Sequence, residues 1–344
     1  MSTSEKRIDY KVTPGGVLKG RLRVAGDKSI SHRSVMLGAL AEGVTQVTGL
    51  LEGEDVLCTL GAFRAMGVQA QGPEQGRLTI QGVGLHGLRP PMQALDMGNS
   101  GTAMRLMAGI LSGQTFDSVL VGDASLSKRP MKRVSEPLGK MGARIDTTEG
   151  GRPPLHIHGG QKLRGIDYLM PMASAQVKSS LLFAGLYADG ETTVTEPAPT
   201  RDHTERMLRG FGYAVQTEGA RVRVRGGGKL KACDIDVPAD ISSATFFLVG
   251  AAIAPGSELV LEHVGINPTR IGVINILRLM GANLAIENER EVGGEPVADL
   301  RIRGSRLKGI RIPEDQVPLA IDEFPAIFIA AACAEGETVL TGAH

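Results

Sequence analysis

Five short polar residues stand at the start of apolar segments that have the length and small-residue content of helices. Each precedes, at a nearly constant distance, a glycine that ends its segment. Four of the distances are 14 positions and the last is 16, in the order Ser29, Asn99, Ser242, Asp322 and Ser174. Side chains of these types accept hydrogen bonds from the free N–H groups of a helix N-terminus. Taken singly, each is typical of a helix cap with no chemical role.

Cations beside these positions indicate more than capping. Lys28 precedes the first position and Arg33 follows it by one helical turn, although the helix macrodipole favours anions there. A bound phosphate or carboxylate would meet both the cations and the free N–H groups. Further cations begin the alternate helical segments, at Arg129, Arg201 and Arg270. Each one alone is compatible with a solvated surface, but together they indicate a cleft for a small molecule with several negative charges.

The other helix starts add uncharged and acidic groups to this pattern. In MGNSGTAMRL, Gly101 leaves the backbone bare enough for a ligand to approach closely. MASAQVKSS places Gln176 and Lys178 on the first turn after Ser174. In PLAIDEFPAIFIAAACAEG, Asp322 opens the apolar segment, where a carboxylate suits the helix dipole without any further role. If that segment reaches the same cationic cleft, Asp322 is the available general base or acid.

These segments belong to an internal repeat. A helix that ends in glycine and leads into a β-branched strand occurs five times, at Gly43, Gly113, Gly190, Gly256 and Gly336. A second such pattern alternates with it, at Gly67, Gly142, Gly212 and Gly281. Each unit is predicted to run strand, helix, strand, helix, strand, strand. The fifth unit begins near residue 310 and the sequence ends inside it, so we expect a whole molecule of about six units, or roughly 420 residues.

The composition is that of a globular protein with two domains. The chain has 344 residues, of which 42% are hydrophobic and 22% charged. A net charge of +1 and only 12 aromatic residues, none of them Trp, argue against a nucleic-acid partner. No apolar run approaches the 18 or so residues of a membrane span, and the charged start MSTSEKRIDYKV is unlike a signal peptide. We therefore expect a cytoplasmic protein with no membrane partner.

The motifs, taken in order, resemble those of one enzyme family. GDKSISHR, MGNSGTAMRL, KRPMKR, SAQVKSSLLFAGL, TRDHTERM and IDEFP are similar to the motif series of the 3-phosphoshikimate 1-carboxyvinyltransferases, or EPSP synthases, over residues 10–344. The SAQVKS and RPMKR forms resemble the class II bacterial branch. The resemblance implies an α/β (α+β) fold, a two-domain inside-out α/β barrel built of βαβαββ units. One domain would be residues 21–237, and the other, discontinuous and truncated, residues 1–20 with 238–344.

The resemblance also implies a reaction. The family transfers the enolpyruvyl group of phosphoenolpyruvate to the 5-hydroxyl of shikimate 3-phosphate and releases phosphate, through a tetrahedral intermediate. This step belongs to the shikimate pathway of aromatic amino-acid biosynthesis, and the family is the target of glyphosate; sensitivity is left open here. No metal and no organic cofactor are implied. The family is commonly monomeric, so we expect a monomer whose partners are the two small-molecule substrates.

Site residues follow from the resemblance motif by motif. Asp322 would take the proton from the 5-hydroxyl, and Lys28 could help phosphate leave. Shikimate 3-phosphate would be bound by Lys28, Ser29, Arg33, Ser174, Ala175, Gln176, Arg201 and Asp322. Phosphoenolpyruvate would be bound by Lys28, Gly101, Arg129 and Gln176.

The sequence departs from the family pattern at its end. It stops at TGAH, before the family's Lys-Glu-Ser-Asp-Arg motif, which supplies a catalytic Glu and further cations. We therefore expect a C-terminally truncated chain with little or no activity alone. Two alternatives stay open. One is the related UDP-sugar enolpyruvyltransferase, although its loop Cys has no counterpart in DASLSKRPMKR. The other is a non-catalytic fragment that binds phosphate ligands.

Overall fold

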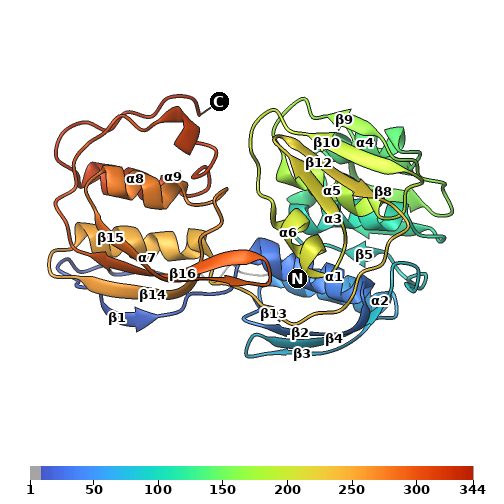
Figure 1. Ribbon diagram of the computed structural model, residues 1–344, viewed down its shortest axis with the longest axis horizontal. Helices are drawn as coiled ribbons and strands as arrows, with labels where there is room; N and C mark the ends of the chain where they lie inside the picture. Colours follow the sequence, from blue (N-terminus) through green and yellow to red (C-terminus); the bar gives the residue numbers. More distant parts are fainter. Residues whose placement is uncertain (1–8, 344) are drawn as a thin grey trace.

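Two α/β bodies are joined by two crossings of the chain (Figure 1). The computed structural model describes residues 9–343. Its helices are α1 (Lys28–Leu40), α2 (Glu54–Ala65), α3 (Gly101–Ser112), α4 (Lys132–Lys140), α5 (Ala175–Gly185), α6 (His203–Gly210), α7 (Ile241–Ile253), α8 (Gly272–Leu279) and α9 (Phe324–Ala332), with short 3-10 turns η1 (Leu126–Lys128) and η2 (Glu314–Gln316). None of the helices within this range is long and apolar enough to cross a membrane.

The strands form sheets of one repeated design. In order they are β1 (Lys19–Leu22), β2 (Glu42–Thr48), β3 (Gln69–Glu74), β4 (Arg77–Val83), β5 (Leu95–Asp96), β6 (Ser118–Val121), β7 (Arg144–Thr148), β8 (Arg152–His158), β9 (Asp167–Leu169), β10 (Glu191–Thr195), β11 (Val215–Glu218), β12 (Arg221–Arg225), β13 (Ile235–Asp236), β14 (Glu258–Gly265), β15 (Asn283–Val292) and β16 (Glu295–Arg303). In the sheet β5-β6-β8-β7, the first pair is parallel and the others are antiparallel. With α3 and α4 between its strands, this unit is the predicted βαβαββ repeat.

The first strands of two units are exchanged between the bodies. β1 precedes α1 in the sequence but pairs in parallel with β14, and β13 precedes α7 but pairs in parallel with β2. Figure 1 shows the blue β1 beside the orange β14. The two crossing segments are hydrogen-bonded to each other, from Asp27 N to Pro238 O at 2.8 Å and from Asp240 N to Ala25 O at 2.9 Å. The bodies therefore meet at a paired, two-stranded connection.

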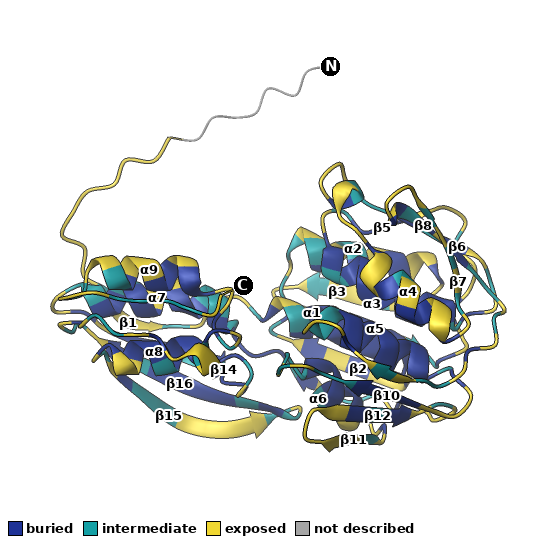
Figure 2. Ribbon diagram, turned by 90° about the horizontal axis from the view of Figure 1, so that it is seen from above, coloured by how far each residue is buried: buried dark blue, intermediate teal, exposed yellow. Residues whose placement is uncertain are grey.

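Each body has its own apolar core. One cluster of buried side chains runs from Ile30 to Val237, and a second runs from Ala239 to Ala330. Leu22 and Val24 pack against the second cluster, so the predicted boundary between residues 20 and 21 falls inside β1. Residues 1–8 and His344 of the predicted discontinuous domain lie outside the described residues. In the larger body the buried faces belong to the central helices α1, α3 and α5 (Figure 2).

Four of the five predicted helix caps are displaced by one or two residues. Ser174 does cap α5, and its Oγ accepts a hydrogen bond from Val177 N. The caps of α1, α3 and α7 are instead Asp27, Ser100 and Asp240, each of which accepts a hydrogen bond from a first-turn N–H group, and α9 follows Glu323. The prediction was wrong there because a neighbouring residue of equally good capping type precedes Ser29 and Ser242 and follows Asn99.

Candidate active site

The facing ends of the two bodies carry the predicted helix starts. A hollow of about 240 Å³ is lined from the first body by the start of α1 and from the second by the start of α7 and the loop before α9; its residues are Asp27, Lys28, Ser29, Arg201, Asp240, Ser242, Arg270 and Asp322. A second hollow of about 630 Å³ includes the start of α5, with Ser174, Ala175 and Gln176. Arg201 lines both hollows, so they adjoin at its side chain, and we call the two together the cleft.

Arg201 and Asp322 meet across this cleft. Nη2 of Arg201, from the loop before α6, is paired with Oδ2 of Asp322, from the loop before α9. About half of the Asp322 side chain is still exposed to solvent. An anionic ligand that engages Arg201 competes with this carboxylate and leaves Asp322 free to accept a proton.

The two predicted cations on α1 have different surroundings. The Lys28 side chain is 54% exposed, and its Nζ lies 3.3 Å from Asp55 Oδ2, a contact too weak to withhold it from a ligand. Arg33 is 3% exposed and donates to Thr204 Oγ1 at 2.7 Å, to Ser179 Oγ at 2.8 Å and to Ser29 O at 2.9 Å. Burial lowers the pKa of Arg33 to about 10. The structure thus places Arg33 behind the cleft, where it supports Ser29.

Three of the four residues predicted for phosphoenolpyruvate lie around the start of α3, and the fourth, Lys28, begins α1 and lines the smaller hollow. Arg129 donates from Nη2 to Asn99 Oδ1 at 3.0 Å, and Gln176 donates from Nε2 to Thr102 Oγ1 at 3.0 Å. A Cβ atom at Gly101 would lie 3.4 Å from Nη1 of Arg129. The structure therefore brings Gly101, Arg129 and Gln176 together at the start of α3.

Arg105 is a member of this group that sequence reasoning missed. It is 4% exposed, its Nη1 donates to Gln176 Oε1 at 2.6 Å, and no carboxylate among residues 9–343 forms an ion pair with it. Burial first, and then the charges of Arg133 and Arg129, lower the pKa of Arg105 to about 10. A buried cation without a counter-charge is costly unless an anion binds. Its spacing of four from Gly101, which puts both on one helix face, was the available signal.

Two cations that the sequence pattern placed in the cleft are neutralised by carboxylates. Lys178 is 1% exposed and forms ion pairs with Glu205 at 2.7 Å and with Glu196 at 3.0 Å. It points into the body, so the expectation that it joins the cationic cleft was wrong. Its partners come from β10's far end and from α6, which the local pattern around residue 178 could not reveal.

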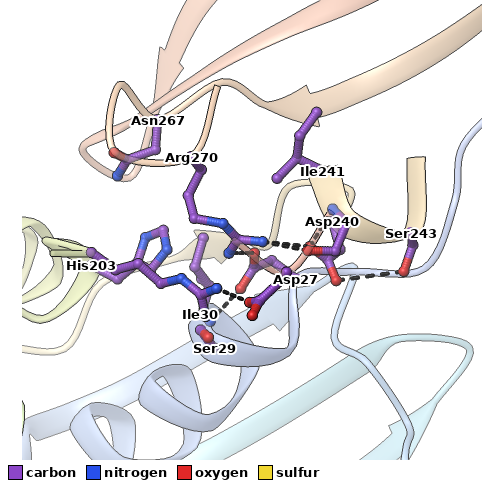
Figure 3. A network of polar contacts seen from close by, with 12 residues as sticks. Asp27, Ser29, Ile30, His203, Asp240, Ile241, Ser243, Asn267 and Arg270 are labelled. Atoms are coloured by element: carbon purple, nitrogen blue, oxygen red, sulfur yellow. Dashed lines mark hydrogen bonds and ion pairs between the residues drawn. The ribbon is translucent and has the colours of Figure 1, made fainter. Parts of the chain in front are cut away.

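Arg270 is the second such cation and lies at the base of the smaller hollow (Figure 3). Its Nη2 donates to Ser242 Oγ at 2.6 Å, and the guanidinium lies within 3.5 Å of carboxylates of Asp27, Asp240 and Glu323. Burial would lower the pKa of Arg270, but these carboxylates outweigh it and raise the pKa. Burial, with the charge of Asp27, raises the pKa of Asp240 to about 6. Arg270 is therefore a structural counter-ion at the connection between the bodies.

Fold and cleft together define a class: a two-domain α/β protein that binds small, multiply anionic molecules between its domains. The family described as EPSP synthase (3-phosphoshikimate 1-carboxyvinyltransferase) matches residues 12–344. A 3-phosphoshikimate 1-carboxyvinyltransferase of Hydrogenovibrio crunogenus is 70% identical over 342 residues, 98% of this chain and 77% of that protein. One of Methylococcus capsulatus is 69% identical over 340 residues, 99% of this chain and 78% of that protein. The chain belongs to the EPSP synthase family.

A solved structure agrees with this assignment. The EPSP synthase from Acinetobacter baumannii superposes with a TM-score of 0.91 at 67% sequence identity, over 95% of this chain and 74% of that one. The predicted fold class and the predicted enzyme class, an enolpyruvyl transferase, are thereby confirmed. Neither of the two alternatives left open by the sequence receives support from these relatives.

Proposed function

We propose that this protein transfers the enolpyruvyl group of phosphoenolpyruvate to the 5-hydroxyl of shikimate 3-phosphate, the reaction named in its relatives. One observation carries the proposal: Arg201 and Asp322 face each other across a cleft lined by helix N-termini and cations. The pair places an anion-binding group next to a carboxylate base at the point where a small anionic ligand would bind. Both substrates carry phosphate, so a cleft of this charge suits them.

Shikimate 3-phosphate is assigned to the α1 and α5 side of the cleft. Ser174 and the backbone of Ala175 offer hydroxyl and N–H donors at the start of α5, and Arg201 supplies the charge. Lys28 and Ser29 contribute from the start of α1. Arg33, being enclosed, is assigned the role of holding the Ser29 backbone rather than of touching the ligand.

Phosphoenolpyruvate is assigned to the α3 side. Gly101 allows its phosphate or carboxylate to approach the helix start, and Arg129 and Gln176 bind it from either side. Arg105 adds a buried positive charge beside Gln176, and the bound phosphoenolpyruvate supplies the negative charge that Arg105 otherwise lacks. Lys28 is exposed and only weakly paired with Asp55, so it can reach the phosphate group of phosphoenolpyruvate that the reaction releases.

The chemistry needs one base and several cations. The 5-hydroxyl oxygen bonds to C2 of phosphoenolpyruvate while Asp322 accepts the hydroxyl proton and C3 takes a proton from solvent water. The tetrahedral intermediate then loses the C2 phosphate, with Lys28 stabilising the departing oxygen, and C3 gives a proton back to water to restore the double bond. Positioning and electrostatic stabilisation by the cations lower the barrier.

Several finer predictions accompany this proposal. We assign residues 21–237 to one domain and the remainder to the other, with the first boundary moved to about residue 24 because Leu22 and Val24 pack against the second core. We also assign the chain to the class II branch, on its SAQVKS and RPMKR motifs. A monomeric state and a cytoplasmic location stay predictions from the sequence.

Calorimetric titration with shikimate 3-phosphate tests the assignment of Arg201. Arg201→Ala removes the charge that lines both hollows, so the dissociation constant should rise by about a hundredfold. The matched control is Arg209→Ala: this arginine lies on α6 and bonds to Val215 O and Thr217 Oγ1, away from the cleft. Equal affinity of the wild type and Arg201→Ala, in folded protein, would contradict the proposed site.

A further inference from the structure

A buried polar network joins α6 of the first body to the start of β16 in the second. Nδ2 of Asn267 donates to Asp202 Oδ1 at 2.6 Å and to Glu295 Oε2 at 2.9 Å. The other oxygen of Glu295 lies 2.7 Å from Nδ1 of His203. His203 enters from the first body and Asn267 from the second (Figure 3). The network therefore crosses the junction between the bodies twice.

The charged and polar groups of this network are buried. His203 and Asn267 are each 2% exposed and Glu295 is 3% exposed. Burial alone would raise the pKa of Asp202, but hydrogen bonds from Arg206 and Asn267 outweigh it and hold the pKa below its ordinary value. One amide nitrogen thus serves two carboxylates. An oxygen in its place would face both of them, and buried charges without donors are strongly unfavourable.

Packing at this junction is incomplete. Beside the network, a cavity of about 100 Å³ lies between α6, β13 and the turn that joins β15 to β16, with Met207, Phe211, Val292 and Glu295 among its walls. The turn is attached to α6 by a further polar contact, from Arg206 Nη1 to Gly294 O at 3.0 Å. Polar contacts therefore hold the hairpin against α6.

The network leads directly to both walls of the cleft. Asp202 follows Arg201, which lines both hollows. On the other side, Oδ1 of Asn267 accepts hydrogen bonds from Thr269 N at 2.9 Å and Thr269 Oγ1 at 2.8 Å, and Thr269 lines the larger hollow. The Asn267 amide thus ties the loop of Arg201 with its nitrogen and its own loop with its oxygen.

We propose that Asn267 is a positioning residue of the enolpyruvyl-transfer site: it fixes the loop of Arg201 relative to the second body, so that Arg201 stays beside Asp322 where shikimate 3-phosphate binds. This inference rests on the proposed function. It assigns Asn267 no contact with either substrate. Its effect on binding passes through Asp202 and Glu295.

Asn267→Asp tests the proposal with almost no change of shape. The variant replaces the shared donor by an acceptor, so the loop of Arg201 should shift and the dissociation constant for shikimate 3-phosphate should rise about tenfold or more. Amide hydrogen exchange in α6 and in the turn between β15 and β16 should become faster. Asn275→Asp is the matched control, because Asn275, on α8, donates to Gln316 of η2, and neither residue lines the cleft.

A second variant separates positioning from general destabilisation. In Asn267→Asp/Asp202→Asn the introduced amide at position 202 donates to the introduced carboxylate at position 267. This restores the contact that holds the loop of Arg201, so binding and exchange should return most of the way to wild-type values. Unchanged binding and exchange in Asn267→Asp would overturn the proposal, and so would a loss that the double variant fails to recover. If the wild type does not bind shikimate 3-phosphate, the proposed function fails; the exchange comparison then decides the role of Asn267 by itself.

Discussion

At the scale of single residues, the surroundings of each charge decide what it can do. Lys178 lies between Glu196 and Glu205 with almost no solvent contact, and burial raises the pKa of Glu205 even beside this cation. Lys178→Met leaves two buried carboxylates without their partner. We expect it to lower the free energy of unfolding of the first body by about 3–5 kcal/mol, measured by denaturant unfolding.

The control for this prediction is an exposed pair of the same chemistry. Lys229 lies 2.9 Å from Glu42, and both side chains are largely in solvent. Lys229→Met should therefore leave the unfolding transition unchanged. Equal effects of the two substitutions would show that Lys178 is not the buried counter-ion described here.

Asp240 gives the connection between the bodies a pH dependence. Its pKa rises from 3.8 to about 6 in the folded protein, chiefly through burial. The native state therefore binds a proton between about pH 4 and pH 6 that the unfolded state has released, and stability falls as pH rises through this window. Over the whole window, this group lowers the free energy of unfolding by about 2–3 kcal/mol.

Asp240→Asn should remove that pH dependence while keeping the cap, because an asparagine oxygen can still accept the hydrogen bond from Ser242 N. Melting temperatures between pH 4 and pH 8 measure it, with the exposed Asp315→Asn as control. At pH 8 the asparagine variant should be at least as stable as the wild type. Profiles of the wild type and Asp240→Asn that run parallel over this range would contradict the assignment.

The sequence predicted which residues lie at the cleft better than it predicted what surrounds each of them. Helix-start spacing and flanking cations pointed to Lys28, Gly101, Gln176 and Asp322, which the structure places at or beside the cleft. The same reasoning could not separate them from Arg270. Its counter-charges come from residues up to 243 positions away, and only the fold brings them together.

At the scale of secondary-structure elements, close helix packing sets the geometry of the site. α3 and α5 carry cleft residues at their starts and approach closely at Gly109, where a Cβ atom would lie 2.1 Å from Ser180 O. Gly109→Ala must push the helices apart. We expect a loss of about 1–3 kcal/mol in stability and weaker binding of both substrates, measured by unfolding and by calorimetry.

Gly61→Ala is the control, and we expect it to have the opposite effect on stability. Gly61 lies inside α2, and a Cβ atom there would meet nothing within 4 Å. Alanine should therefore stabilise the protein by about 1 kcal/mol through its helix propensity. If Gly109→Ala stabilises to the same extent, the close approach of α3 and α5 is not real.

Element order was predictable, whereas element partners were not. The recurring helix-glycine-strand pattern predicted the βαβαββ unit, because the periodicity of each segment is local. The exchange of β1 and β13 left no local trace. Both strands are short, and both pair in parallel with the first long strand of a sheet. Nothing in their own residues therefore distinguishes one sheet from the other. Here the family resemblance, rather than the pattern, assigned the first 20 residues to the second domain.

At the scale of the whole molecule, the strand exchange makes the two bodies depend on each other. The sheet of each body includes one strand that is adjacent in sequence to the first helix of the other body. Ile235 on β13 is buried against the first body, so Ile235→Ala should destabilise that body by about 2–4 kcal/mol. Leu22→Ala, on β1, should instead destabilise the second body, by less because Leu22 is only half-buried.

Hydrogen exchange read separately for each body measures this effect. Faster exchange should appear in β2 for Ile235→Ala and in β14 for Leu22→Ala. The reverse assignment would contradict the observed pairing.

The central claim is that one cleft holds both substrates, and a calorimetric titration with phosphoenolpyruvate tests it most directly. The titration is made with and without saturating shikimate 3-phosphate, and with unphosphorylated shikimate as the control ligand. Shikimate 3-phosphate should tighten phosphoenolpyruvate binding by about tenfold or more, because both ligands draw the two bodies together around Arg201 and Asp322. Shikimate should not. Folded protein whose affinity for phosphoenolpyruvate is the same in all three conditions would contradict the account.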